Sequence, residues 1–413
     1  MKRDWDHIDS RWLFKQSLPN DAWFHRIYTY DDIVGLRSVI QQIKEKNSLF
    51  LAAYEGYPSV IDALYKNFIC PFDFDESKIT FVSAAFNVQE LINEFATKYN
   101  RKPIKGVYFP FFEWLWDDQF FNIVRDGENS LENFYEIRRN SNMIKTYTNL
   151  NRRWALHRST CVGLLHHYNL MDKGFVTFNV SHPIQALKQN KTKFNKNIFK
   201  ILNINDFTSI NDPNNAKKIW KSSLPYILFQ YRNNKEIYDI FKNNKTICDI
   251  PEMTIPSPKL FETVHFYGVD SQLDYLHTYS LVSLISETTY ASEYKSPFET
   301  HHPYELTNEN SIVYTEKVFR PMTYRQPFIA LSCPGYLRGL RQLGYKTFSP
   351  FIDESYDDII DDGQRMLMAL EEVKKLTLLD QTEQKKFLDN VDEVCQHNLI
   401  HLKSRFQTFL QTL

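Results

Sequence analysis

The sequence predicts an α/β protein whose parallel sheets are covered by helices. Short apolar stretches alternate with segments of helical spacing, for example strands over 49–54 and 79–85 around a helix over 58–67, and this alternation is typical of parallel sheets. Two apolar runs, 281–285 and 328–331, are bounded by turn signals, which favours buried parallel strands. With 413 residues the chain exceeds the usual size of a single core, so we expect two domains.

The first part of the chain continues this pattern. Residues 30–46 have helical spacing, and Asn87 is a good N-cap for a helix over 88–99. Residues 104–109 form a further short strand that is closed by a proline. We therefore assign residues 1–142 to a first α/β domain on the acceptor side.

A second α/β domain is expected over residues 143–380. It begins with a strand at 143–150, followed by a helix over 154–169 and a strand over 175–178. Three arginines stand in the first turn and the start of the helix: Arg152, Arg153 and Arg158. Because helix N-termini present unpaired N–H groups to anions, this turn predicts a phosphate site, and a solvated basic helix start is the alternative.

The histidines of this segment, His157, His166 and His167, are interpreted as surface or packing residues rather than metal ligands. The sequence lacks a histidine pair with a carboxylate at metal-ligand spacing. We therefore predict no metal site here.

An insertion at about 185–256 differs in composition from the rest of the chain. Over 185–250, 12 Lys and Arg residues stand against 5 Asp and Glu residues, a net charge of +7, and aromatic residues interleave with them. Such a mixture binds nucleic acid through phosphate contacts and base stacking. The other interpretation, which we favour, is an insertion whose helices are packed by its aromatic residues.

Polar side chains follow the two apolar runs of the second domain. The first run ends in Glu287, and Thr315-Glu316-Lys317 follows after a polar loop and precedes the second run. Open α/β sheets bind ligands at the carboxyl ends of their strands. Two acids and a lysine gathered there can hold a ribose and a diphosphate.

This stretch, S-E-T, a loop, Y-T-E-K, then a proline and a strand, resembles the donor-site signature of fucosyltransferase-like (glycosyltransferase family ten-type) enzymes of the GT-B fold. In that family an E-N-S-type strand end is followed by I-T-E-K. The resemblance covers residues 281 to about 345, with a weaker patch at 149–178. At the position of the family's asparagine, this chain has Thr288.

The resemblance implies two Rossmann-like domains that face each other across a cleft, with a nucleotide-sugar bound by the second. It implies that Glu316 binds the ribose hydroxyls and that Lys317, with one of the three arginines, neutralises the donor diphosphate. Thr315 belongs to the same donor-binding stretch, and Glu287 either orients Lys317 or binds the donor sugar. Ordinary ion pairs near a sheet edge are the alternative explanation for these residues.

The expected reaction transfers a sugar to a glycan or another hydroxyl acceptor, with inversion and without a bound metal or other cofactor. An inverting transfer needs a base for the acceptor hydroxyl, expected from the first domain. Glu113 stands among aromatic residues that raise a carboxyl pKa and stack on sugar rings, and Glu55, after the strand at 49–54, is its rival. Each is also explained as an ordinary loop carboxylate.

The C-terminal part of the sequence is helical in pattern. A helix over 336–343 precedes an acidic loop, where Asp353 or Ser355 is expected to cap a long helix. The other acids of this loop are interpreted as helix-end residues rather than a metal site: Asp357, Asp358, Asp361 and Asp362. Residues 381–413 are predicted to be helical, and the resemblance implies that they pack back on the first domain.

Composition excludes several classes. A net charge of −1 argues against a polyelectrolyte binder, and 11 glycines without a G-x-G-x-x-G or P-loop pattern argue against those nucleotide folds. The 5 cysteines are scattered, which favours a reducing compartment over disulfides or zinc. Without an apolar leader or a span-length apolar stretch, we expect a soluble cytoplasmic protein.

Two other functions stay open. One is a DNA-base glycosyltransferase that grips the duplex with the basic insertion. The other is a non-catalytic nucleotide- or sugar-binding protein. Salt-sensitive DNA binding distinguishes the first, and ligand binding without transfer distinguishes the second.

Overall fold

The computed structural model describes residues 22–27, 30–53, 58–110, 131–151, 155–178, 224, 227–228, 230–243, 276–290 and 311–410. Contacts divide the chain into two units. Unit 1 comprises Met1–Phe111 with Pro303–Val313, and unit 2 comprises Phe112–His302 with Tyr314–Leu413. Both units are α/β and contain a sheet of four strands that pair in parallel.

The boundary between the units differs from the predicted position at residue 142. Helix α9 (Leu131–Asn140) belongs to unit 2. The reason is Arg138, which is 1% exposed and donates hydrogen bonds to three backbone carbonyls of this unit. A contact of this kind joins residues more than a hundred positions apart, which no local pattern reveals.

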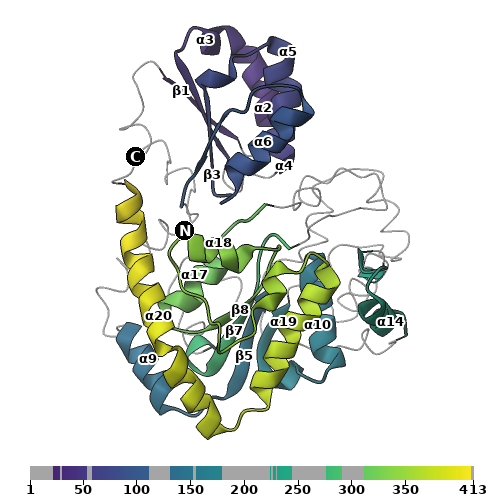
Figure 1. Cartoon of the computed structure of the whole chain (residues 1–413), viewed down its shortest axis with the longest axis vertical. Helices are drawn as coiled ribbons and strands as arrows, with labels where there is room; N and C mark the ends of the chain where they lie inside the picture. Colours follow the sequence, from purple (N-terminus) through teal and green to yellow (C-terminus); the bar gives the residue numbers. More distant parts are fainter. Residues whose placement is uncertain are drawn as a thin grey trace, which may run out of the picture. The chain divides into compact units, whose positions relative to one another are not determined.

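The sheet of unit 1 confirms the alternation seen in the sequence. Its strands are β1 (Ala22–Ile27), β2 (Ser48–Ala53), β3 (Ile79–Ser83) and β4 (Lys105–Tyr108), in the order β1-β2-β3-β4. The intervening helices include α2 (Tyr30–Leu36), α3 (Ile40–Lys44), α4 (Pro58–Leu64), α5 (Cys70–Phe72) and α6 (Val88–Lys98). In Figure 1, α2, α4 and α6 lie on the same face of this sheet. Alternate residues of β2 are buried, as one covered face requires.

Asn87 occupies the N-cap position of α6, as predicted, but its side chain has another role. The side chain of Asn87 does not cap the helix. Its Oδ1 instead accepts the N–H of Ile312 at 3.0 Å, while the N–H of Phe86 donates to the Ile312 carbonyl at 2.7 Å. The amide is used to hold a segment from the far end of unit 1, just before the chain enters unit 2 at Tyr314.

The sheet of unit 2 reverses its strand order. Its strands are β5 (Lys145–Asn151), β6 (Gly174–Phe178), β7 (Ser280–Ser286) and β8 (Phe328–Leu331), in the order β6-β5-β7-β8. The chain moves outward from β5 to β6 and then returns to the other side of β5. The carboxyl ends of β5 and β7 therefore form a topological switch point, where open α/β sheets bind ligands.

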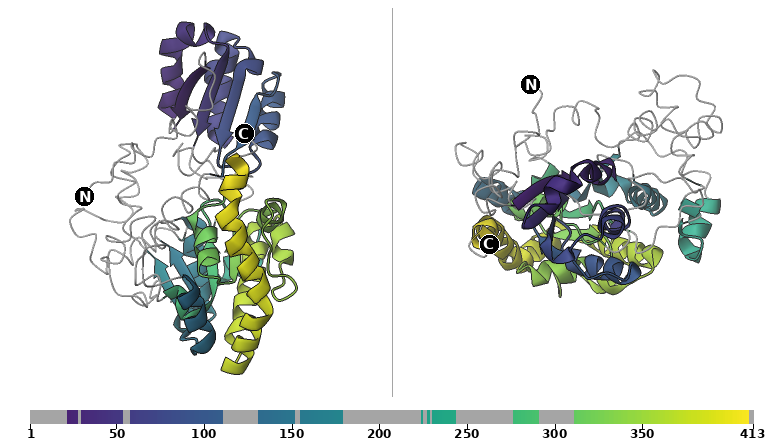
Figure 2. Two further views of the ribbon diagram at one scale, coloured as in Figure 1. Left: turned by 90° about the vertical axis from the view of Figure 1, so that its left-hand side faces the viewer. Right: turned by 90° about the horizontal axis from the view of Figure 1, so that it is seen from above.

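Helices cover both faces of this sheet. Figures 1 and 2 show α10 (Leu156–His167) and α19 (Asp362–Thr377) on one face, and α9, α17 (Glu316–Thr323) and α20 (Gln381–Leu410) on the other. The chain leaves β5 toward β6 on one side and leaves β7 toward β8 on the other side. Because both crossovers are right-handed, their helices lie on opposite faces of the sheet. Strand β7 is buried along its whole length, as expected for a central parallel strand.

The C-terminal helices are confirmed, with one correction. Helix α18 (Tyr336–Gln342) and the helix over 381–410 are present, but α19 begins only after Asp361, whose side chain accepts the N–H of Gln364 at 2.7 Å. Asp353 does not cap it, because its carboxylate accepts the nearer N–H of Ser355. Described contacts of α20 join unit 2, as in the Arg325–Asp392 ion pair, and packing on the first domain stays a prediction.

The acidic loop serves helix ends, as predicted. Asp357 accepts the N–H groups of Leu337 and Arg338 at the start of α18, both at 2.9 Å. Asp358 pairs with Arg338, and Asp362 accepts from Arg365 of its own helix. In the described ranges, no group of three or more Asp, Glu, His or Cys residues is arranged to hold a metal ion.

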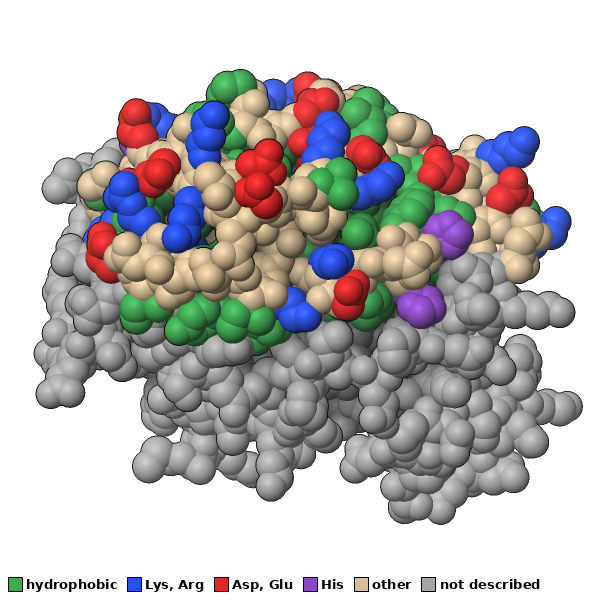
Figure 3. All heavy atoms as spheres, turned by 90° about the horizontal axis from the view of Figure 1, so that it is seen from below, with side chains coloured by type: hydrophobic (Ala, Val, Ile, Leu, Met, Phe, Trp, Pro, Cys, Tyr) green, Lys and Arg blue, Asp and Glu red, His purple; other side chains and the backbone are tan. Residues whose placement is uncertain are grey.

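The described part of the insertion is packed. Ile227, Tyr231 and two residues of α14 (Lys235–Asn243), Ile237 and Phe241, are buried. Over residues 230–243 three cations face two acids, a net charge of +1, so most of the predicted charge lies outside the described residues. On the face shown in Figure 3, basic and acidic side chains are intermixed.

Among the helices that the structure describes, none combines the length and the apolar character needed to cross a bilayer. Even α20, with 30 residues, carries charges along its length.

Candidate functional site

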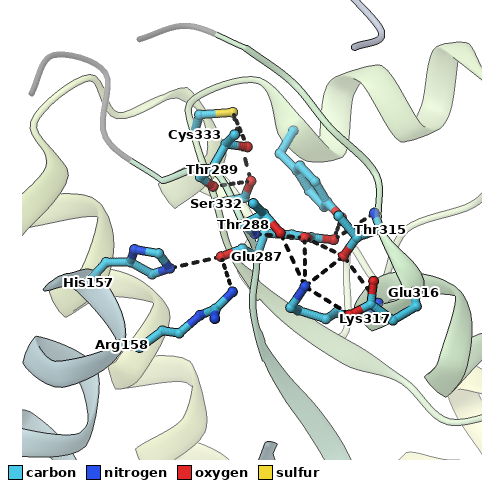
Figure 4. Close-up of polar contacts among 11 residues, drawn as sticks. His157, Arg158, Glu287, Thr288, Thr289, Thr315, Glu316, Lys317, Ser332 and Cys333 are labelled. Atoms are coloured by element: carbon cyan, nitrogen blue, oxygen red, sulfur yellow. Dashed lines mark hydrogen bonds and ion pairs between the residues drawn. The ribbon is translucent and has the colours of Figure 1, made fainter. Parts of the chain in front are cut away.

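The polar residues predicted to gather in unit 2 do gather, at the switch point. Strand β5 ends at Asn151, β7 ends at Ser286, and Glu287 follows directly. Helix α10 begins close after β5, and α17 begins at Glu316. Figure 4 shows side chains from α10, from the end of β7 and from the start of α17 directed toward one another.

Glu287 is the centre of this cluster and is fully buried. Its Oε1 accepts the N–H of Thr315 at 3.1 Å and the hydroxyl of Tyr336 at 2.8 Å. Its Oε2 accepts the hydroxyl of Thr315 at 2.7 Å and the N–H of Thr288 at 2.9 Å. Four donors occupy both oxygens, so this carboxylate acts as an anchor between β7, α17 and α18. Of its two suggested roles, orienting Lys317 fits this geometry better than binding a sugar.

Thr315 is the N-cap of α17, a helix absent from the sequence prediction. Its backbone is extended, and its Oγ1 accepts the N–H of Lys317 at 3.3 Å. Glu287 accepts hydrogen bonds from both the N–H and the hydroxyl of Thr315. These two bonds fix the position of the residue at which α17 begins.

Lys317 lies inside the cluster with 18% of its side chain exposed. Its Nζ lies 3.0 Å from Oγ1 of Thr315, 3.2 Å from Oγ1 of Thr288 and 3.1 Å from Oε1 of Glu316. Oε2 of Glu287 is 3.9 Å away. The ammonium is therefore held in place by neighbours from the end of β7 and from the start of its own helix.

Glu316 is buried and remains ionised. Burial alone would raise its pKa, but the charges of Lys317 and Arg320 outweigh this effect, and the net shift of its pKa is downward. An acid at the first position of α17 also complements the helix dipole.

The opposite side of the cluster comes from α10. Nε2 of His157 and Nη2 of Arg158 both bond the carbonyl oxygen of Glu287, at 2.9 and 3.0 Å. A carbonyl oxygen only accepts, so Nε2 of His157 carries a proton. The imidazole stacks on Tyr290 with ring centres 5.0 Å apart, and burial, together with Arg158, holds its pKa well below the usual value. His157 is thus a packing residue, as predicted, and Arg158 reaches the site.

The sequence analysis missed two asparagines of β5. Nδ2 of Asn149 donates to the Leu284 carbonyl at 2.8 Å and to Ser286 Oγ at 3.2 Å. Asn151 donates to Oδ1 of Asn149. Asn149 therefore joins β5 to β7 at the switch point, and Asn151 holds the amide of Asn149 within β5. The N-L-N sequence at the end of a predicted strand is the signal that points to them.

Arg365 of α19 was also missed. Its guanidinium donates to the Ser332 carbonyl after β8 at 2.8 Å and to the Tyr290 carbonyl after β7 at 2.6 Å. It also pairs with Asp362 and lies over the ring of Tyr290. It therefore holds two loops beside the site, and no sequence pattern distinguishes it from other helical arginines.

The remaining candidates lie outside the described residues: Glu55, Glu113, Arg152 and Arg153. Five others meet in unit 2: Arg158, Glu287, Thr315, Glu316 and Lys317.

The fold and this cluster define an α/β protein with a charged site at the switch point of a parallel sheet. Comparison with models of protein families, with curated proteins and with solved structures gave no match.

Proposed function

We propose that this protein is a glycosyltransferase that moves a sugar from a nucleotide-sugar to an acceptor hydroxyl. The observation that carries the proposal is the pair of cations at the switch point. Lys317 and Arg158 come from different helices, and both are held by Glu287 at the end of the central strand. A diphosphate is the anion that two such cations suit.

The start of α10 supports an anion at this position. The helix begins after Ala155, whose methyl group cannot cap it, and its first turn contains no acidic residue. Its first backbone N–H groups therefore favour a negative charge. The start of α18 offers no such place, because Asp357 already occupies its N–H groups.

In the proposed reaction the bond from the sugar to the diphosphate breaks while the acceptor oxygen attacks. Negative charge then grows on the leaving oxygen, and fixed cations stabilise that charge most in the transition state. Lys317 and Arg158 fill this role, and Arg152 or Arg153 is a further candidate from the sequence. Glu113 or Glu55 takes the proton of the acceptor hydroxyl.

The proposal includes a GT-B arrangement of the two units, an inverting reaction without a metal, and a cytoplasmic location. It rests on two parallel α/β sheets, on the charged cluster, and on the resemblance of Glu287 and of Thr315-Glu316-Lys317 to the family signature.

A binding screen followed by a transfer assay tests the function. Thermal shift against nucleotides and nucleotide-sugars identifies the donor, since a ligand of the native state raises the melting temperature. Transfer of a labelled sugar from that donor is then measured for wild type, Lys317→Ala and the exposed control Lys385→Ala. Absence of any nucleotide-dependent shift would overturn the proposal.

The same measurements separate the two other functions. A shift with a nucleotide-sugar but no transfer or hydrolysis indicates a binding protein. Salt-sensitive retention of duplex DNA indicates the DNA-base enzyme.

A further inference from the structure

We propose that Glu316 is an internal competitor for the ligand of Lys317, so that the site admits an anion only when it also brings neutral hydrogen-bond donors such as sugar hydroxyls. Glu316 is then a specificity-determining residue that rejects bare anions. This inference rests on the proposed function, because it concerns the same ligand and the same cation.

The hydrogen atoms of the Lys317 ammonium are already in use. An ammonium group has three donors. Thr315 Oγ1, Glu316 Oε1 and Thr288 Oγ1 accept them at 3.0, 3.1 and 3.2 Å. A phosphate oxygen that binds Lys317 must therefore replace one of these three acceptors.

Glu316 is the acceptor that gives way. Thr315 is fixed, because its hydroxyl donates to Glu287 at 2.7 Å and accepts the N–H of Lys317. Thr288 is tied at its backbone, where its N–H donates to Glu287 at 2.9 Å. Glu316 reaches Lys317 through a longer side chain. Rotation about the torsions of that side chain moves the carboxylate away from Lys317 when a ligand takes its place. It is also an anion, so its pairing with Lys317 cancels the charge that a ligand would meet.

Displacing Glu316 leaves a carboxylate in a poorly hydrated place, with 10% of its side chain exposed. The carboxylate then loses one of the two cations that favour its charged form, and only Arg320 remains, which costs free energy. A bare anion gains the contact with Lys317 but leaves the carboxylate of Glu316 without that partner. A ligand that carries both a phosphate and hydroxyl groups gains Lys317 and also supplies hydrogen bonds to the carboxylate. Binding of the phosphate to Lys317 and binding of the hydroxyl groups to Glu316 therefore strengthen each other.

Titration calorimetry with inorganic diphosphate in EDTA tests this inference on the full chain. Glu316→Gln keeps the shape of the side chain and removes its charge, so the affinity for diphosphate should rise about tenfold or more, the scale of one charge-assisted hydrogen bond. Glu90→Gln, an exposed acid in the first turn of α6, is the matched control and should match wild type. Adding Lys317→Gln to Glu316→Gln should abolish the gain. Glu316→Ala, checked for an unchanged melting curve, provides a second variant.

The outcomes distinguish this inference from the proposed function. If wild type binds UDP or GDP and Glu316→Gln gains no affinity for diphosphate, the competition is wrong and the proposed function stands. If neither protein binds a nucleotide or diphosphate, the competition and the proposed function are both wrong. A gain for diphosphate that survives Lys317→Gln also overturns the competition, since the anion then binds elsewhere.

Discussion

Glu287 and Thr315 bond each other twice, although 28 positions separate them in the chain. The hydroxyl of Thr315 donates to one carboxylate oxygen at 2.7 Å and its N–H donates to the other at 3.1 Å. This double contact connects the end of β7 to the start of α17 and sets where Lys317 lies.

Glu287→Gln should destabilise the fold by about 2–4 kcal/mol. The amide nitrogen places N–H groups against donors from Thr288 or Thr315, and those donors lose their acceptor in a fully buried place. Urea unfolding measures the free energy. Glu371→Gln, at a side chain 53% exposed, is the control and should change the free energy little. Equal effects at both positions would contradict the anchor role.

Thr315→Val should cost about 1–3 kcal/mol of unfolding free energy, because it removes an N-cap and a hydrogen bond to Glu287 while keeping the side-chain shape. Thr315→Ser keeps the hydroxyl and should recover most of this loss. Chemical denaturation of the two variants beside wild type gives the comparison. A valine variant as stable as the serine variant would show that the cap contributes nothing.

Lys317→Ala should lower sugar transfer by about two to three orders of magnitude, the scale for a group that stabilises developing charge. Lys317→Arg should restore only part of the rate, because a planar guanidinium does not fit the place of a compact ammonium. Turnover with the donor from the binding screen is the measurement. Wild-type turnover in a folded Lys317→Ala protein would refute the assigned role.

Removal of metal should leave transfer unchanged. Basic side chains perform the charge neutralisation in the proposed reaction, so activity after dialysis against EDTA should equal the untreated activity. Loss of activity with recovery on adding manganese would indicate a metal-dependent mechanism instead.

Acidification should destabilise the protein below about pH 6.5, the ordinary pKa of histidine. Burial lowers the pKa of His277 to about 3 and that of His157 well below its usual value. The unfolded chain therefore binds protons that the folded chain does not, and stability present above pH 6.5 is lost as the pH falls toward the folded pKa. For each of these histidines, the free energy of unfolding falls by about 1.4 kcal/mol per pH unit between pH 6.5 and the pKa of the folded state.

Unfolding of wild type and His277→Gln at pH 7.5 and pH 5 measures this effect. The variant removes one titrating histidine, so its loss of stability on acidification should be smaller by about 2 kcal/mol. Identical losses in both proteins would show that His277 does not contribute.

The sequence by itself determined the local elements. Apolar runs bounded by turn signals predicted β2, β7 and β8, and helical spacing predicted α10 and α18, because backbone conformation and burial periodicity depend on neighbouring residues. It also placed Glu287 at the end of a strand and Thr315 after a loop, where the polar cluster forms. Asp357 and Asp361 were identified as helix-end acids for the same local reason.

The tertiary structure alone decided how these elements combine. The order β6-β5-β7-β8, and with it the switch point, follows from pairing between distant strands. Asn87 bonds Ile312 instead of capping its helix, and Arg138 draws α9 into unit 2. In each case a buried polar group must find a partner, and the partner that satisfies it lies far along the chain. Sequence patterns report the need for such a partner, while only the packed chain identifies which group supplies it.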